Sequence, residues 1–147
     1  MPETGVETVD AIAVVIAQLN ADATLGTFGL LKWHKDVARL ATPIPGSYAY
    51  GIVSFQGGVR VTYPGPAFIA IYGLLLVKVV GTEDLFTTVI KPAYSRVYTV
   101  LTGSQGSNSG ITMFGKLYQE TPIDYTETPQ GAPKIQHLGG AWRILAG

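Results

Sequence analysis

The segment from Gly103 to Gly110 reads Gly-Ser-Gln-Gly-Ser-Asn-Ser-Gly, so its hydroxyl groups and glycines could in principle bind phosphate or supply a nucleophile. A phosphate-binding P-loop needs Gly-Lys-Ser or Gly-Lys-Thr at the start of a helix, whereas this segment is expected to follow a helix and precede a strand. A nucleophile elbow needs serine at the centre of Gly-x-Ser-x-Gly, and the residue at the centre of 106–110 is Asn108. We therefore interpret the segment as a surface or assembly loop and predict no catalytic residue.

The two histidines, His34 and His137, are too few for a three-histidine metal centre. Lys32 and Lys35 flank His34 and would repel a cation, so we expect His34 to be an exposed loop residue. His137 precedes Leu138-Gly139-Gly140, which favours a place in a turn or at a strand edge. The chain has no cysteine, which excludes disulfides, thiolate metal sites and a cysteine nucleophile. The sequence thus predicts no metal and no cofactor.

Two pairs of carboxylates have spacings that could matter for acid–base chemistry. Asp124 and Glu127 lie three residues apart in a predicted strand, where their side chains point to opposite faces, so a shared site is not expected. Glu83 and Asp84 follow Thr82, a candidate N-cap, and carboxylates in a first helical turn interact favourably with the helix dipole. These acids indicate structure and not catalysis.

The first helix is predicted from about Gly5 to Asn20. Thr4 and Glu7 match a capping box, and apolar residues then recur at spacings of three and four residues. The segment from Ala21 to Ser47 has no sustained period and contains several glycines and prolines. We expect it to be a long irregular connection, of the kind that is usually functional or ordered by a partner.

The second helix is predicted to start at Thr82 and to close at Gly103. Pro92 lies inside its apolar pattern and should kink the helix or mark a fresh start, because proline deletes one intrahelical hydrogen bond. Tyr94 and Tyr98, four residues apart, are expected to pack together against the core.

The β-rich stretch from Tyr48 to Val61 contains Gln56-Gly57-Gly58, which predicts a turn followed by another strand that ends near Tyr63. Pro64-Gly65-Pro66 should break any strand ladder. The next strand, Phe68 to Val80, is apolar on both alternating faces, which is typical of a strand in the middle of a sheet covered on both sides.

Three further strands are predicted at Ile111–Glu120, Ile123–Glu127 and Lys134–Ala146, the last with Trp142 and Arg143 on opposite faces. No internal repeat or boundary divides residues 1–147. The expected fold is a single α+β domain, with a mixed, mostly antiparallel sheet and two amphipathic helices packed on one face.

Composition indicates a protein that assembles with others. Hydrophobic residues make up 47% of the 147 residues and charged residues only 14%, against about 25% charged in ordinary soluble domains. The most apolar stretch, Ala67–Val80, contains Gly73 and Lys78 and is shorter than the roughly 20 residues of a membrane helix. The acidic N-terminal segment does not resemble a signal peptide. Apolar surface is therefore expected to be covered by partners.

The charges sum to zero, which argues against general binding of nucleic acid. Their distribution is nevertheless uneven. Every charged residue up to Asp22 is acidic, whereas bases outnumber acids between Lys32 and Lys116. Such asymmetry suits head-to-tail contact between copies, although two solvated faces would explain it equally well.

The stretch from Pro122 to Ile144 resembles the closing hairpin of tail terminator proteins from long-tailed bacteriophages. The shared pattern is a Tyr-x-Glu strand, a polar turn with glycine, and a Gly-Gly-x-aromatic-Arg strand. It matches at Tyr125, Glu127, Gly131, Gly139, Gly140, Trp142 and Arg143. The rest of the chain follows the family only in the order of its elements.

The resemblance implies a structural virion protein without enzymatic activity or cofactor. Such proteins form a ring, usually a hexamer, that caps the finished tail tube, ends its polymerisation and docks to head-completion proteins. The implied location is the head–tail junction of the virion, after assembly in the host cytoplasm. No membrane contact and no specific nucleic-acid contact are implied, although DNA can pass through such a ring.

Contacts between subunits or with partners are predicted for nine residues: Lys32, Trp33, Lys35, Arg39, Arg60, Tyr63, Gln105, Asn108 and Arg143. Arg143 is the first choice, because arginine is enriched in protein interfaces. Three alternatives stay open. The chain could be a head-completion or neck ring protein, a small ligand-binding or hydrolytic domain that uses the serine-rich loop, or a nucleic-acid binder that uses Lys32, Lys35 and Arg39.

Overall fold

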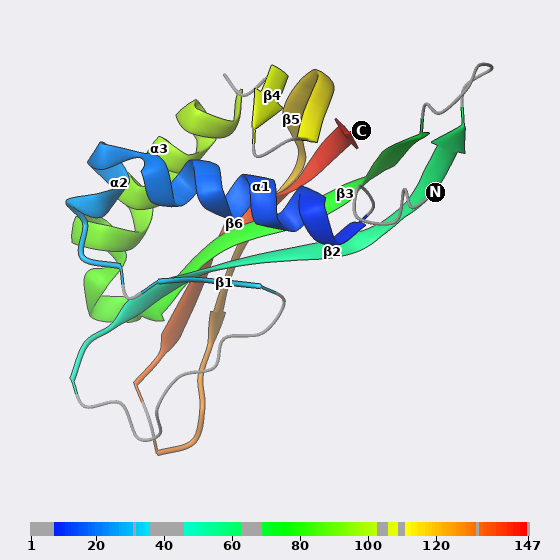
Figure 1. Ribbon diagram of the computed structural model, residues 1–147. Coiled ribbons are helices and arrows are strands. Elements are labelled where there is room, and N and C mark those ends of the chain that lie inside the picture. Colours follow the sequence, from blue (N-terminus) through cyan, green and yellow to red (C-terminus); the bar gives the residue numbers. More distant parts are fainter. Residues whose placement is uncertain are drawn as a thin grey trace.

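The computed structural model describes residues 8–30, 32–35, 46–62, 69–102, 106–108, 111–131 and 133–146. They form one six-stranded sheet in the order β1-β2-β3-β6-β5-β4, and the α-helices lie on one face of it (Figure 1). All strand pairs are antiparallel except β1 with β2. The predicted α+β class and its mostly antiparallel sheet are confirmed.

Along the chain, two helices are followed by three strands, two irregular turns, a third helix and three further strands. Their bounds are α1 Thr8–Ala21, α2 Ala23–Gly26, β1 Trp33–Lys35, β2 Ala49–Thr62, β3 Ile69–Thr82, a 3-10 turn Glu83–Leu85, a π-helical turn Phe86–Ile90, α3 Lys91–Thr102, β4 Gly106–Asn108, β5 Ile111–Glu127 and β6 Ile135–Ala146.

The buried face of helix α1 matches the stripe predicted from Val9, Ile12, Ala13, Ile16 and Leu19 only in part, because Ala13 is exposed and Val15, which the stripe left out, is fully buried. Ile12, Val15 and Leu19 are at most 3% exposed and contribute to the core. The capping box at Thr4–Glu7 lies outside the described residues. After α1, the carboxylate of Asp22 caps α2 by accepting a hydrogen bond of 2.9 Å from the Leu25 amide, and it also pairs with Arg96 of α3 at 2.7 Å. This single side chain therefore ties α2 to α3.

The segment predicted to be irregular, Ala21–Ser47, contains both α2 and β1, so that prediction is wrong in part. Strand β1 is three residues long and pairs in parallel with β2, with Trp33 opposite Gly51. A segment this short carries no readable alternation, and only its pairing with β2 makes it a strand. His34, expected in an exposed loop, is instead 7% exposed within β1.

Strand β2 runs without a break through the predicted turn at Gln56-Gly57-Gly58. Its register with β3 skips one residue between Phe55 and Gly57, which is a β-bulge. Glycine permits a bulge as readily as it permits a turn, and the long complementary partner β3 favours the bulge. Pro64-Gly65-Pro66 lies outside the described residues.

Strand β3 lies inside the sheet between β2 and β6, as predicted, but only one of its faces is covered by helices. Leu75, Val77 and Val79 are fully buried beneath α1 and α3. Leu74 and Leu76 alternate with them and are only half-buried on the opposite face. The expectation of two covered faces was therefore half wrong, because apolar alternation does not reveal whether a second layer is present.

The chain enters α3 through two irregular turns. Thr82 precedes them in an extended conformation and makes no side-chain cap. The α-helical part begins at Lys91, next to Pro92, as expected for a proline that marks a fresh start. Tyr94 is 8% exposed, but Tyr98 is 46% exposed and only its ring contact with Trp142 links it to the core.

The C-terminal hairpin has two long strands where three shorter ones were predicted. Strand β5 continues from Ile111 to Glu127, with register shifts between Phe114 and Tyr118 and between Gln119 and Thr121. These irregularities explain why its alternation looked interrupted in the sequence. Gly131 sits in the turn with a φ of 74°, a conformation that favours glycine.

Candidate interaction surface

The sheet face opposite the helices, here called the open face, has no helix packed on it within the described residues (Figure 1), and Tyr118, Thr121, Tyr125 and Glu127 are exposed on it. Its members follow from the strand registers, which place Leu75 and Trp142 on the helix side and their sequence neighbours on the other. The open face comprises Tyr50, Ile52, Ser54, Leu74, Leu76, Lys78, Val80, Tyr118, Thr121, Ile123, Tyr125, Glu127, His137, Gly139, Ala141 and Arg143.

Arg143 lies on the open face, opposite in direction to buried Trp142, as the sequence alternation predicted. Its guanidinium binds the carboxylate of Glu120 through contacts of 2.7 Å to each oxygen, and the side chain keeps 25% of its surface exposed. The bidentate pair fixes the guanidinium beside β5. Arg143 is therefore oriented by its own chain while remaining accessible.

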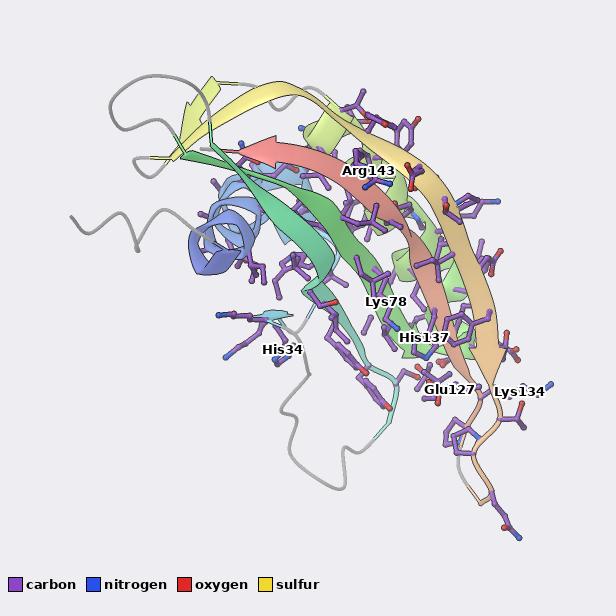
Figure 2. All side chains as sticks on the ribbon, turned by 90° about the vertical axis from the view of Figure 1, so that its right-hand side faces the viewer. His34, Lys78, Glu127, Lys134, His137 and Arg143 are labelled. Atoms are coloured by element: carbon purple, nitrogen blue, oxygen red, sulfur yellow. The ribbon has the colours of Figure 1, made fainter. Side chains whose placement is uncertain are left out.

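A second cluster lies at the end of the open face near the β5–β6 turn, where Figure 2 shows Lys78, Glu127 and His137 close together. The His137 ring stacks on Tyr125 at 4.2 Å, and its Nε2 contacts the carboxylate of Glu127. Lys78 Nζ donates to the Tyr125 hydroxyl at 3.0 Å. Three strands thus contribute to one cluster of aromatic and charged groups.

His137 is 6% exposed on β6, an internal strand, so the predicted place in a turn or at a sheet edge is wrong. Burial lowers its pKa, and Glu127 opposes this effect by raising it. The ring is consequently neutral near pH 7, and the geometry suits a proton on Nε2 that is donated to Glu127. Its Nδ1 is buried and has no hydrogen-bond partner among the described residues.

Close packing against main-chain atoms requires Gly139 of the hairpin motif, whereas Gly140 faces the flexible end of the Gln119 side chain. A Cβ on Gly139 would lie 2.3 Å from the carbonyl oxygen of Val77, and one on Gly140 would lie 2.3 Å from Oε1 of Gln119.

Asp124 and Glu127 point to opposite faces, as predicted. Asp124 accepts a hydrogen bond of 2.7 Å from Gln136, whereas Glu127 contacts His137.

The serine-rich segment is only partly described. Gly106–Asn108 forms β4, which pairs with the start of β5, so this part of the predicted loop is a short strand. The rest of the segment, Gln105 included, lies outside the described residues. No group of three or more potential metal ligands occurs within the described ranges.

Those predicted contact residues whose side chains are described lie at separate places in the fold. Lys32 and Lys35 are exposed at β1, while Trp33 between them is 7% exposed and belongs to the core. Asn108 lies in β4 and Arg60 in β2, and Arg143 lies on the open face. Arg39, Tyr63 and Gln105 lie outside the described residues.

Sequence reasoning overlooked the two tyrosines of β5. Tyr118 and Tyr125 are 48% and 45% exposed, and exposed aromatic side chains are enriched where proteins meet. Their only sequence signal is a position in a strand that alternates poorly. The exposure of these two tyrosines follows from the position of β5 toward one side of the sheet, which the sequence does not reveal.

Charged side chains are exposed on both sides of the sheet. Lys32 and Lys35 are exposed at the β1 side, and Glu120, Asp124 and Glu127 are exposed along β5. Three bases lie among these acids: Arg143 pairs with Glu120, Lys134 lies at the hairpin turn, and Lys78 on β3 reaches Tyr125. The acids along β5 are therefore interleaved with bases.

Comparisons with known proteins give a match in fold. The chain is similar to a chain in the solved structure of the virion of a native gene transfer agent particle, with a TM-score of 0.59 and 19% identity over 92% of this chain and 93% of that one. A second solved structure is similar with a TM-score of 0.45 and 11% identity. No protein-family model and no curated protein matches the sequence.

Within the described residues, no helix has the length and apolar character needed to cross a membrane.

Proposed function

We propose that this protein is a structural component of a phage-like particle and acts as a tail terminator, a ring that caps the tail tube. The observation that carries the proposal is the fold shared with a virion chain over 92% of one sequence and 93% of the other. A likeness that spans most of both chains supports a common architectural role better than a likeness of one motif would.

The closing hairpin supports the choice of terminator. The residues that match the family pattern have different structural roles in this hairpin. Gly139 allows β6 to approach β3, Trp142 fills the core, and Arg143 pairs with Glu120 at the surface. A pattern that combines packing with an oriented surface arginine suits a strand that contributes to both the fold and an interface.

The proposed partners are further copies of the chain in a hexameric ring, as is usual in the family that the hairpin resembles, together with the tail tube protein and a head-completion protein. The proposed location is the head–tail junction, with DNA passing through the ring. Sparse charge and the half-buried apolar residues Leu74 and Leu76 on the open face fit a protein whose surface is largely covered after assembly.

The test is to remove the protein from a strain that produces the particles and to measure tail tubes by electron microscopy. A terminator leaves tubes that grow beyond their normal length, and the purified full chain added back stops that growth. Tubes of normal length that fail to join heads would overturn this proposal in favour of a neck ring protein. Intact particles would overturn a structural role altogether.

A further inference from the structure

Within the described ranges, the last part of β5, residues 123–127, has a neighbouring strand on one edge only. β6 pairs with it from Ile123 opposite Gly139 to Glu127 opposite Ile135, whereas β4 pairs with β5 only at residues 111–113. Most side chains of this part are exposed. A segment with few buried contacts at the margin of a sheet opens at a lower free-energy cost than the strands inside the sheet. Residues 123–127 are therefore the part of the hairpin that separates most easily from β6.

A hinge precedes this part of β5. Upstream, Gln119 accepts a hydrogen bond from the hydroxyl of Tyr94 on α3, which anchors the strand to the core. The register with β6 then skips Glu120, which makes a β-bulge, and Pro122 follows without an amide hydrogen to donate. A bulge next to a proline interrupts the ladder of hydrogen bonds. Residues 123–127 can therefore move without displacing the anchored part.

His137 on β6 lies beside residues 123–127. Its ring is 6% exposed, stacks on Tyr125 and contacts the carboxylate of Glu127 through Nε2. A protonated imidazole carries two N–H groups, and each needs an acceptor when it is buried. Glu127 is an acceptor for Nε2, but Nδ1 is buried and has no partner among the described residues. Protonation therefore leaves a buried donor unsatisfied for as long as β5 packs against the ring.

Charged groups on β3, on β5 and at the hairpin turn surround His137 (Figure 2). Lys78 of β3 donates to the Tyr125 hydroxyl at 3.0 Å, Glu127 contacts the ring, and Lys134 is exposed at the turn. Burial has the largest influence and lowers the pKa of His137, Glu127 raises it, and Lys78 lowers it again. The net effect favours a neutral ring while the hairpin is closed.

His34 is another group near this cluster that titrates close to neutral pH. Its ring contacts that of Tyr50 with centroids 5.7 Å apart, and burial above all lowers its pKa. Burial is also the main cause that raises the pKa of Tyr50, so the Tyr50 hydroxyl stays protonated. Asp124 points to the opposite face of the sheet, away from His137. The pH response of the hairpin is therefore assigned by comparing the two histidines.

We propose that protonation of His137 opens this end of the hairpin. Residues 123–127 turn away from β6 about Pro122, while β6 stays on β3, with which it pairs as far as Ile135 opposite Thr82. Opening releases Tyr125 from its stack and exposes both ring nitrogens of His137 to water. The result is a pH-sensitive latch at the exposed end of the hairpin, and it does not depend on the proposed ring.

The sign of the pH response follows from the two forms of the hairpin. In the open form His137 is solvated, with a pKa of about 6.5, and it binds the proton more readily than in the closed form. The hairpin therefore stays closed above about pH 6.5. Below that value, each further pH unit favours the open form by at most about tenfold, down to the lower pKa of the closed form.

Hydrogen exchange of the purified full chain at pH 7.5 and 5.5, corrected for the intrinsic effect of pH on exchange, tests the latch. The hydrogen-bonded amides of residues 123–127 should lose protection by up to about tenfold at the lower pH. At both pH values they should be less protected than residues 75–79 of β3, because they exchange without unfolding of the core. Urea below the unfolding range should speed exchange in β3 and leave residues 123–127 almost unchanged, since local opening exposes little surface.

Substitution of His137 removes the titrating group. His137→Phe keeps an aromatic ring against Tyr125 but cannot take the proton, so the difference between the two pH values should disappear at residues 123–127. His137→Gln is the second variant if the phenyl ring disturbs folding, and it should give the same result. His34→Phe is the matched control, because His34 is 7% exposed within β1, and it should keep the wild-type pH response.

Two results would overturn the inference. An equal pH response of residues 123–127 in the wild type and in both His137 variants would mean that another group controls the hairpin. Exchange of these residues at the rate of β3, and with the same dependence on urea, would mean that β5 opens only when the whole chain unfolds. Neither result bears on the terminator proposal, which the length of the tail tubes tests.

Discussion

The indole nitrogen of Trp142 donates a hydrogen bond of 3.0 Å to the hydroxyl of Tyr94, which connects β6 to α3 inside the core. The Tyr94 hydroxyl in turn donates to Gln119 on β5. Desolvation by burial raises the pKa of Tyr94 to about 12, so its hydroxyl stays protonated and can both accept and donate. The face of the sheet that packs on the helices is thus held by one polar chain within an apolar core.

This chain of hydrogen bonds predicts two different losses of stability. Tyr94→Phe removes the shared hydroxyl and leaves the Trp142 donor unsatisfied, which should lower the free energy of unfolding by about 1–3 kcal/mol. Trp142→Ala creates a cavity and should cost about 3–5 kcal/mol. Urea unfolding measures both. Tyr98→Phe on the exposed side of α3 is the control, and an equal loss in that variant would contradict this assignment.

Close approach of β6 to β3 predicts that Gly139 does not tolerate a side chain. The added Cβ of Gly139→Ala would lie 2.3 Å from Val77 O and 2.5 Å from the Cα of Lys78, both main-chain atoms that cannot move independently. We expect a loss of about 1–3 kcal/mol, as for other overpacked sites. Gly26→Ala meets no atom within 4 Å and should be neutral or slightly stabilising. Thermal melts of the two variants decide the matter, and equal melting temperatures would contradict the close packing.

The buried imidazole of His137 predicts that stability falls on acidification. Burial lowers its pKa in the folded protein, so the unfolded chain binds the proton more readily. The stability that the neutral His137 ring contributes is fully present above the unfolded pKa of about 6.5, and it is lost as the pH falls through the lower pKa of the folded protein. Urea unfolding across this range should show a decline that is weaker in His137→Gln.

His34 is the necessary comparison for that measurement, because burial, followed by the charge of Lys32, lowers its pKa as well. The two single variants and the double variant therefore have to be measured together. Glu127→Gln removes a group that raises the pKa of His137. The unfolding free energy of this variant should therefore go on declining to lower pH. A decline that is unchanged in all of these variants would locate the titrating group elsewhere.

The pair between Arg143 and Glu120 predicts a way to separate an interface from a local ion pair. Arg143→Glu should leave the chain folded, with a change in unfolding free energy of no more than about 1 kcal/mol for a partly exposed pair, while it weakens the ring. The double variant Arg143→Glu with Glu120→Arg restores the local pair with reversed polarity. If Arg143 contacts a neighbour, sedimentation should show that the double variant still assembles poorly, and full recovery of assembly would assign Arg143 only to the hairpin.

Long elements with a clear period could be predicted from the sequence. The spacing of Ile12 and Leu19 predicts one buried helical face, although it missed Val15, and the alternation of Trp142 with Arg143 places the two side chains on opposite faces in any sheet. The central position of β3 followed from its apolar character in the same way. These features depend on residues a few positions apart, and such neighbours are related by the geometry of one element.

Other features depended on contacts between distant residues. Strand β1 exists only because Trp33 pairs with Gly51, and the glycine pair after Gln56 became a bulge only because β3 continues beside it. The open face arose because both long helices pack on the other side of the sheet. The distance of Lys32 and Lys35 from the acids of β5 likewise required a strand order that sets β1 and β5 toward opposite sides. Periodicity reports which side chains of an element avoid water, but where each element lies relative to the others is decided by packing across the whole chain.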